Sequence, residues 1–193
     1  MFKKFLVASC FLTTMTGCLS TIDSTNLQST TPVPEDPAYN KIYQESSQKF
    51  DFIDKFETKY KITVSQLNPA LRQAIAARHE KVFLEPQPLL TEASQKTAFF
   101  ITVYTANGKL ADLADDRLWS VQLRTGSSVL KPSSIKRIAP KERWYVFFPD
   151  INTWSTEYLV LFDQNAPVNQ PDAVTAVSEL ILASPEGNIT TRW

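Results

Sequence analysis

The chain contains very few of the residues on which most catalytic sites depend. His79 is the only histidine, so two histidine ligands cannot come together around a metal ion. It follows Ile75 by four residues on the apolar side of a predicted helix, where we expect a packed imidazole with one hydrogen-bonded nitrogen. The 4 glycines never cluster, which excludes a phosphate-binding loop, and no serine stands in a Gly-x-Ser-x-Gly elbow. These shortages indicate that the protein is not an enzyme.

An excess of one charge is also missing, as is cysteine from the body of the chain. The 20 basic residues are matched by 20 acidic residues, and no basic run occurs, so we exclude nucleic-acid binding. The 2 cysteines, Cys10 and Cys18, both lie close to the start. The chain after Cys18 therefore folds without disulfides, thiolate nucleophiles or cysteine ligands for metals.

The chain opens with the pattern of a secretory leader. Lys3 and Lys4 precede an apolar run over residues 5–12. Threonines at positions 13, 14 and 16 end this run, which leaves it too short to span a bilayer. A small-residue segment then leads to a cysteine, so this part of the chain is expected to be cut off during export.

The segment Met15-Thr16-Gly17-Cys18 resembles the lipobox of bacterial lipoproteins. The resemblance implies that residues 1–17 are a signal peptide and that Cys18 carries diacylglyceryl and N-acyl lipid, which together anchor a protein durably. A plain secretory signal is one alternative. A second box, Val7-Ala8-Ser9-Cys10, is another, but it leaves almost no apolar core after Lys4.

The residues after the anchor point indicate where the folded part stands. Leu19 follows the cysteine in place of the aspartate that retains enteric lipoproteins on the inner membrane, so the resemblance favours the periplasmic face of the outer membrane. Residues 18–37 are dominated by Ser, Thr and Pro and are predicted to be a flexible tether. Random-coil scaling gives this tether a reach of roughly 25 Å.

Residues 38–97 are predicted to be helical. Aromatic and aliphatic residues recur there at three- and four-residue steps: Tyr39, Ile42, Tyr43, Phe50, Ile53, Phe56 and Tyr60. This stripe either packs on the same domain or binds a partner. A second helix is expected to begin at Asn68-Pro69 and to end near Glu85, and a short third helix is expected over residues 89–97.

Residues 98–193 are predicted to be all β, with about seven strands. The expected strands are 98–105, 118–124, a short segment at Val129, 134–138, 144–148, 157–162, and a last hairpin of 176–183 and 188–193. No helical crossover separates them, which favours antiparallel pairing. The fold predicted for the whole chain is an immunoglobulin-like antiparallel β-sandwich preceded by a helical hairpin.

About half of the chain resembles a family of uncharacterised bacterial lipoproteins. The resemblance rests on residues 65–82, on Phe-Phe-Ile-Thr-Val-Tyr-Thr at 99–105, on Asp-Leu-Ala-Asp and the following Trp-x-Val within 112–121, and on Pro-Ser-Ser-Ile at 132–135. Such a resemblance implies a helical front, a β body and an envelope setting. It implies no activity.

Asp112, Asp115 and Asp116 form an acidic cluster in a predicted loop between strands. Carboxylate oxygens are the ligands that Ca²⁺ prefers, so these residues are candidate calcium ligands, to which Asp150 and Asn152 could add oxygens. The spacing does not match an EF-hand loop. The alternative is that the aspartates cap turns or pair with Arg117; no other cofactor is expected.

Aromatic residues in the second half of the chain indicate a site that could stack on sugar rings. Trp154 lies in a predicted loop and Tyr158 follows it, and both are candidate ligand contacts; Trp144, Tyr145 and Trp193 are further aromatic residues of this region. The alternative is that the tryptophans fill the open ends of the sandwich.

Together these patterns predict a non-enzymatic, membrane-anchored envelope lipoprotein that acts as a docking or accessory subunit for another protein. The alternative function is a carbohydrate-binding module that contacts peptidoglycan or surface polysaccharide.

Overall fold

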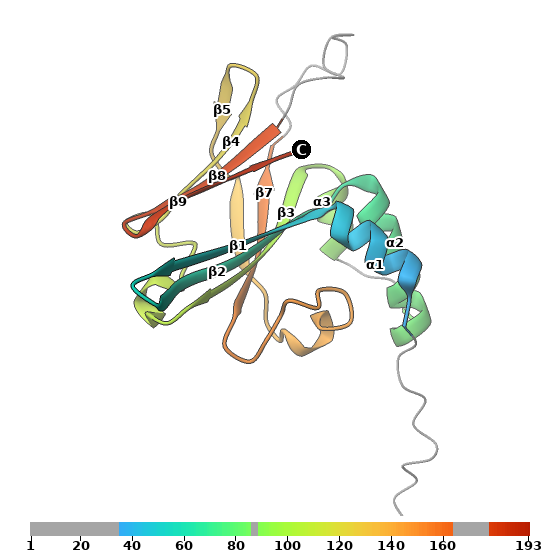
Figure 1. Cartoon of the computed structure of the whole chain (residues 1–193). Coiled ribbons are helices and arrows are strands. Elements are labelled where there is room, and N and C mark those ends of the chain that lie inside the picture. Colours follow the sequence, from blue (N-terminus) through green and yellow to red (C-terminus); the bar gives the residue numbers. More distant parts are fainter. Residues whose placement is uncertain (1–34, 86–88, 164–177) are drawn as a thin grey trace, which may run out of the picture. The chain divides into compact units, whose positions relative to one another are not determined.

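The chain forms two antiparallel β-sheets, seen in a computed structural model that describes residues 35–85, 89–163 and 178–193. One sheet has the strand order β1-β2-β3-β7-β6 and the other the order β5-β4-β8-β9 (Figure 1). The strands are β1 Ser47–Asp54, β2 Glu57–Gln66, β3 Thr97–Thr105, β4 Ser120–Thr125, β5 Ser128–Leu130, β6 Ser134–Arg137, β7 Thr156–Phe162, β8 Ser178–Ser184 and β9 Gly187–Arg192.

The main core lies between the inner faces of the two sheets. On β3, Phe99, Ile101 and Val103 point into this core, where they meet Leu180 and Leu182 of the four-stranded sheet. The residues between them on β3, such as Phe100, point to the opposite side and are also buried. Strand β7 follows the same pattern. Both central strands are therefore apolar on two faces, which explains their nearly continuous runs of large apolar residues.

A third layer covers the outer face of the five-stranded sheet. It consists of helices and of the segment around the 3₁₀ turn η3, and its core holds Tyr39, Tyr43, Phe100, Phe147 and Phe148. The rings of Phe100 and Phe148 stack with centroids 3.7 Å apart. The short elements are α1 Pro37–Glu45, α2 Pro69–Phe83, α3 Leu89–Ser94, η2 Gly108–Leu110 and η3 Glu142–Trp144 (Figure 1).

The predicted long helix with its stripe from Tyr39 to Tyr60 is wrong in its second half. Helix α1 ends at Glu45, and the next residues form the hairpin β1–β2, in which Phe50 pairs with Ile62 and Phe52 with Tyr60. Tyr60 and Ile62 belong to the main core, and Phe50 and Phe52 alternate with polar residues on the paired strand, so the period of this hairpin is two. The hairpin separates α1 from α2, so the two helices do not follow one another as a helical hairpin.

The predicted strand 144–148 is also wrong. Its consecutive apolar residues form η3 and the turn after it, and Trp144, Phe147 and Phe148 all pack into the third layer. An unbroken apolar run has no period from which strand and turn can be distinguished.

Other sequence-based expectations are confirmed. Helix α2 begins after Asn68, whose side chain accepts a 2.8 Å hydrogen bond from the Leu71 amide, and Pro69 occupies its first turn. The last hairpin, β8–β9, turns at Pro185 and Glu186, between the paired residues Ser184 and Gly187. The mainly β architecture with two antiparallel sheets is likewise confirmed.

Candidate functional site

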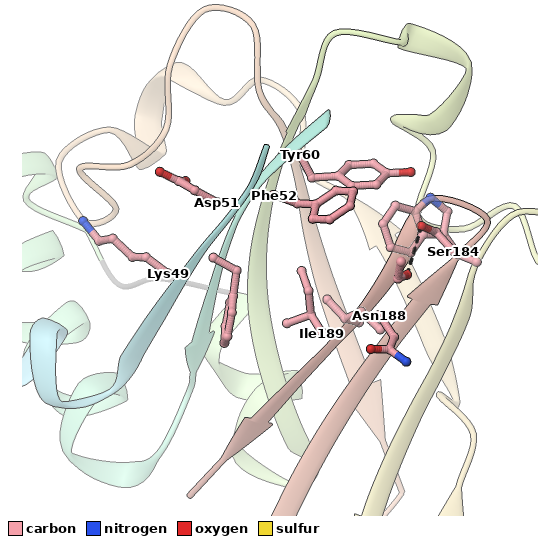
Figure 2. A pocket seen from close by; sticks show the side chains of 11 residues that line it. Lys49, Asp51, Phe52, Tyr60, Ser184, Asn188 and Ile189 are labelled. Carbon is pink, nitrogen blue, oxygen red and sulfur yellow. Dashed lines mark hydrogen bonds between the residues drawn. The ribbon is translucent and has the colours of Figure 1, made fainter. Parts of the chain in front are cut away.

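An open slot lies between strands β1 and β9, which are edge strands of different sheets. Phe52 reaches into it from β1 and Ile189 from β9 (Figure 2), and Phe50 of β1 also lines it. The cavity has a volume of about 400 Å³. Because the edges of the two sheets stay apart here, the main core is reachable from outside.

The floor of the slot is aromatic. Tyr60 and Trp119 meet edge to face with ring centroids 5.2 Å apart, and the Trp119 indole donates a 3.0 Å hydrogen bond to the Leu110 carbonyl. The Tyr60 hydroxyl is buried and has no hydrogen-bond partner among the described residues. Burial raises the pKa of Tyr60 above that of a solvent-exposed tyrosine.

The ends of the slot differ. At one end the Gln48 amide donates a 2.7 Å hydrogen bond to the Arg192 carbonyl and so ties β1 to β9. At the other end Gly187 lies next to the Phe52 ring, so that a side chain at position 187 would place its Cβ 4.0 Å from the ring. The charged residues at the rim have partners of their own: Lys49 pairs with Asp150 at 2.6 Å. The slot therefore suits an elongated apolar group rather than acid–base chemistry.

Beside the slot, the tip of the β1–β2 hairpin exposes apolar side chains. Phe52 is 39%, Ile53 58% and Phe56 105% exposed. Lys55 and Phe56 form the two-residue turn, with φ values of 47° and 66°. The sequence prediction missed this tip because it placed Ile53 and Phe56 on a helix. The turn lacks the Asn-Gly or Asp-Gly signal that would have marked a hairpin.

Trp154 stands on a braced loop in another part of the fold. Its side chain is 78% exposed, and its amide donates to Asn152 Oδ1 at 2.9 Å. The Lys141 ammonium donates to the carbonyls of Asn152, Thr153 and Ser155 at 2.7, 2.9 and 2.7 Å. A single cation thus holds three carbonyls around the base of the Trp154 loop.

The other aromatic candidates are placed less favourably for contact with a ligand. Tyr158 is 1% exposed and faces the main core, with its hydroxyl donating to the Ala111 carbonyl at 2.8 Å. Trp144 is buried in the third layer, and Trp193 packs against Phe99. Trp144 thus fills the third layer and not an open end of the sandwich, whereas Trp154 is exposed.

The acidic cluster is engaged in local contacts. Asp115 accepts two hydrogen bonds from the Arg117 guanidinium, at 2.9 and 2.7 Å, and these hold the pKa of Asp115 below its usual range. Asp112 accepts from the Ala114 amide, and Asp116 is exposed. Across residues 35–85, 89–163 and 178–193, no three side chains of the kinds that bind metals lie close enough to hold an ion. Calcium binding stays a prediction.

Asp150 and Asn152, the further oxygen donors considered for calcium, are occupied by other contacts. Asp150 accepts hydrogen bonds from Tyr43 at 2.7 Å and from Lys49 at 2.6 Å. Asn152 belongs to the braced Trp154 loop. Asp150 thus contacts α1 and β1, and Asn152 contacts its own loop, whereas the acidic cluster is a separate segment of the chain.

His79 is packed as the sequence predicts. It is 1% exposed, and its Nδ1 lies 2.6 Å from the Glu85 carbonyl, while Nε2 has no partner among the described residues. The ring lies between Phe83 and Phe147, with centroid distances of 4.8 and 5.7 Å. Its surroundings are those of a core residue.

Ser133 lies near two lysines in the part of the chain that the structure describes. Lys136 follows Ser133 at the Ser-x-x-Lys spacing, but its ammonium is held by Glu92 at 2.7 Å. Lys96 Nζ lies 3.2 Å from Ser133 Oγ and is itself paired with Asp163 at 2.9 Å. Both lysines are thus engaged as cations, so neither is placed to act as a base toward the serine.

Cys18 and residues 19–34 of the predicted tether lie outside the described residues. The tether prediction is wrong at its end, because the Asp36 side chain caps α1 and Pro37 is the first residue of that helix. In the part of the chain that the structure describes, no helix is both long and apolar enough to cross a bilayer. Comparison of the chain with known protein families, with curated proteins and with solved structures finds no match in any of the three.

Proposed function

We propose that the protein is a lipid-anchored envelope lipoprotein that docks onto another protein through the β1 side of its sandwich. The observation that carries this proposal is the continuity of two apolar features, the exposed hairpin tip and the slot, which share Phe52. Contiguous exposed apolar surface on a protein is typical of an interaction site. The lipobox resemblance at Cys18 supports the anchor and the envelope setting.

The edge position of β1 supports docking as well. An edge strand presents unpaired backbone N–H and C=O groups, and proteins commonly shield such groups with charge, proline or a covering segment. Strand β1 alternates Lys49 and Asp51 with Phe50 and Phe52, and the phenylalanines face the slot. A partner segment could therefore pair with the strand while placing an apolar side chain in the slot.

The test is chemical crosslinking in intact cells that express the full chain with a C-terminal tag, followed by identification of the captured molecules. We expect one envelope protein in stoichiometric amount, and its capture should fall when Phe52 is changed to Asp. The control is Val129→Asp, which adds the same charge at an exposed apolar position on β5. Recovery of cell-wall fragments without protein would contradict docking.

The braced loop of Trp154 favours a second function, the binding of cell-wall or surface glycan. An exposed indole on a loop of fixed geometry is suited to stacking on a sugar ring, because little conformational freedom is lost on binding. We expect purified cell wall to pellet the wild-type chain more than Trp154→Ala. Equal pelleting of both would show that the Trp154 indole does not contribute to binding of the cell wall.

A further inference from the structure

The turn of the β1–β2 hairpin has an unfavourable sequence for its backbone conformation. Asp54 pairs with Glu57, so Lys55 and Phe56 form a two-residue loop, and both have positive φ. This combination belongs to the type I′ turn, for which Asn-Gly and Asp-Gly are strongly preferred. A bulky aromatic residue with positive φ is an outlier, because its Cβ crowds the backbone.

The Phe56 side chain also contributes no packing to the fold that could offset this strain. It is 105% exposed, the highest fraction among the exposed large apolar residues of the described chain. Residues held in such strained backbone conformations cluster at functional sites. The position therefore points to a role for Phe56 outside its own chain.

Leu84 has a similar left-handed backbone conformation, but it stands at a position where that conformation is common. It has φ of 57°, is 87% exposed and forms the C-cap of α2. Left-handed residues are common at helix ends, so its conformation has a structural reason. Phe56, in contrast, stands at a hairpin tip with Ile53 exposed close by in the sequence and Phe52 beyond it.

The charges around the tip indicate what kind of surface it meets. Asp54 and Glu57 flank Lys55, and Lys59 is paired with Glu57 at 2.7 Å. This balanced set gives no net attraction to an anionic bilayer, for which several unpaired cations would be expected. Alternating charges around an apolar centre match the rim and core of a protein interface.

We infer that the β1–β2 hairpin tip is an anchor that inserts Phe56, with Ile53 beside it, into an apolar pocket of the docked protein. The inference rests on the proposed docking function and specifies its central contact. A turn tip projects from the surface, so its counterpart is concave. A single aromatic anchor in a desolvated pocket commonly carries a large share of the affinity of an interface.

The first step of the test places a photocrosslinking phenylalanine analogue at position 56 of the full chain in living cells, and in a parallel strain at position 129. Val129 is exposed and lies on β5, an edge strand of the four-stranded sheet. We expect position 56 to form an adduct with one protein and position 129 to form none with it. Adducts of position 56 with phospholipid alone would overturn the inference.

The second step purifies the crosslinked protein and measures its affinity for the full chain and for two variants. Phe56→Gly should weaken binding by at least about tenfold, since it removes a buried aromatic anchor. The same change relieves the positive φ, so the melting temperature should rise by about 2–4 °C. Leu84→Gly is the matched control, with relief of the same conformation and unchanged affinity.

The remaining outcomes separate the anchor from the docking function. If whole-chain crosslinking captures a partner while Phe56→Gly binds that partner as well as the wild type, docking stands and the tip anchor is overturned. If neither approach captures a protein, both fail. A lower melting temperature for Phe56→Gly would mark Phe56 as a structural residue and would also overturn the inference.

Discussion

The hydroxyl of Tyr39 donates a 2.7 Å hydrogen bond to the carbonyl of Phe147, a residue 108 positions away in the sequence. This buried bond attaches α1 to the segment that covers the five-stranded sheet. Tyr39→Phe would leave the carbonyl without its donor, and we expect the free energy of unfolding to fall by about 1–2 kcal/mol. Urea unfolding monitored by circular dichroism measures the change; an unaltered midpoint would contradict it.

Tyr60→Phe is predicted to behave in the opposite way. The Tyr60 hydroxyl is buried at the floor of the slot and has no partner within residues 35–85, 89–163 and 178–193, so its removal relieves a desolvated polar group and breaks no hydrogen bond there. We expect stability equal to or above that of the wild type in the same urea titration. A loss as large as that of Tyr39→Phe would mean that the hydroxyl has a partner in solution.

Stability should decline in strongly alkaline solution. Burial raises the pKa of Tyr158 from 10.0 to about 12, and burial also raises the pKa of Tyr39 and Tyr43. Between these values the unfolded tyrosine loses its proton while the folded one keeps it. The free energy of unfolding therefore falls as pH rises, by at most about 1.4 kcal/mol per pH unit for each tyrosine.

Thermal unfolding of the wild type and of Tyr158→Phe across this pH range tests the assignment. The variant should show a shallower decline with pH, whatever its stability at neutral pH. Parallel curves for the two proteins would show that Tyr158 ionises alike in the folded and unfolded states.

Lys141 is predicted to determine the order of the Trp154 loop. Lys141→Met removes the donor shared by three carbonyls, and we expect a loss of about 2 kcal/mol in stability with greater mobility of the Trp154 indole. Lys141→Arg should restore less than half of the loss, because a planar guanidinium cannot reproduce the arrangement of an ammonium. Urea unfolding and Trp154 fluorescence anisotropy measure the two effects.

Cys18→Ser tests the anchor. If Cys18 carries the lipid, the variant should move from the membrane fraction to the soluble fraction, and the mass of the acyl groups should disappear from the purified chain. Cys10→Ser is the control and should change neither property. Membrane association retained by Cys18→Ser would contradict lipidation at this residue.

Several strands of the second half of the chain could be predicted because the burial of each strand face determines where apolar residues occur in the sequence. Val121 and Leu123 alternate with polar residues on β4, and β3 and β7 are apolar on both faces because each is covered twice. Asn68 and Pro69 marked the start of α2 through local chemistry that needs no tertiary information.

The first hairpin could not be recognised because the spacing of its apolar residues fits both the period of a helix and the period of a strand. Phe50, Ile53 and Phe56 follow helical steps, yet Phe50 lines the slot, and the other two are exposed at the tip. The slot was missed for another reason, because it exists only where two edge strands distant in sequence approach each other. Trp154 could be placed in a loop, but the three carbonyls around Lys141 are a tertiary arrangement with no local signal.

The order in which strands pair has a consequence for how the chain acquires its structure. Strand β3 pairs with β7, and β4 pairs with β8. In the sequence, β4 lies between β3 and β7, and β7 lies between β4 and β8. The strands of each sheet are therefore interrupted in the sequence by strands of the other sheet. Because such pairing requires contacts between distant segments, folding slows to milliseconds or longer. A chain emerging from a ribosome or an export channel would have to keep its apolar strands from aggregating until its last hairpin had arrived.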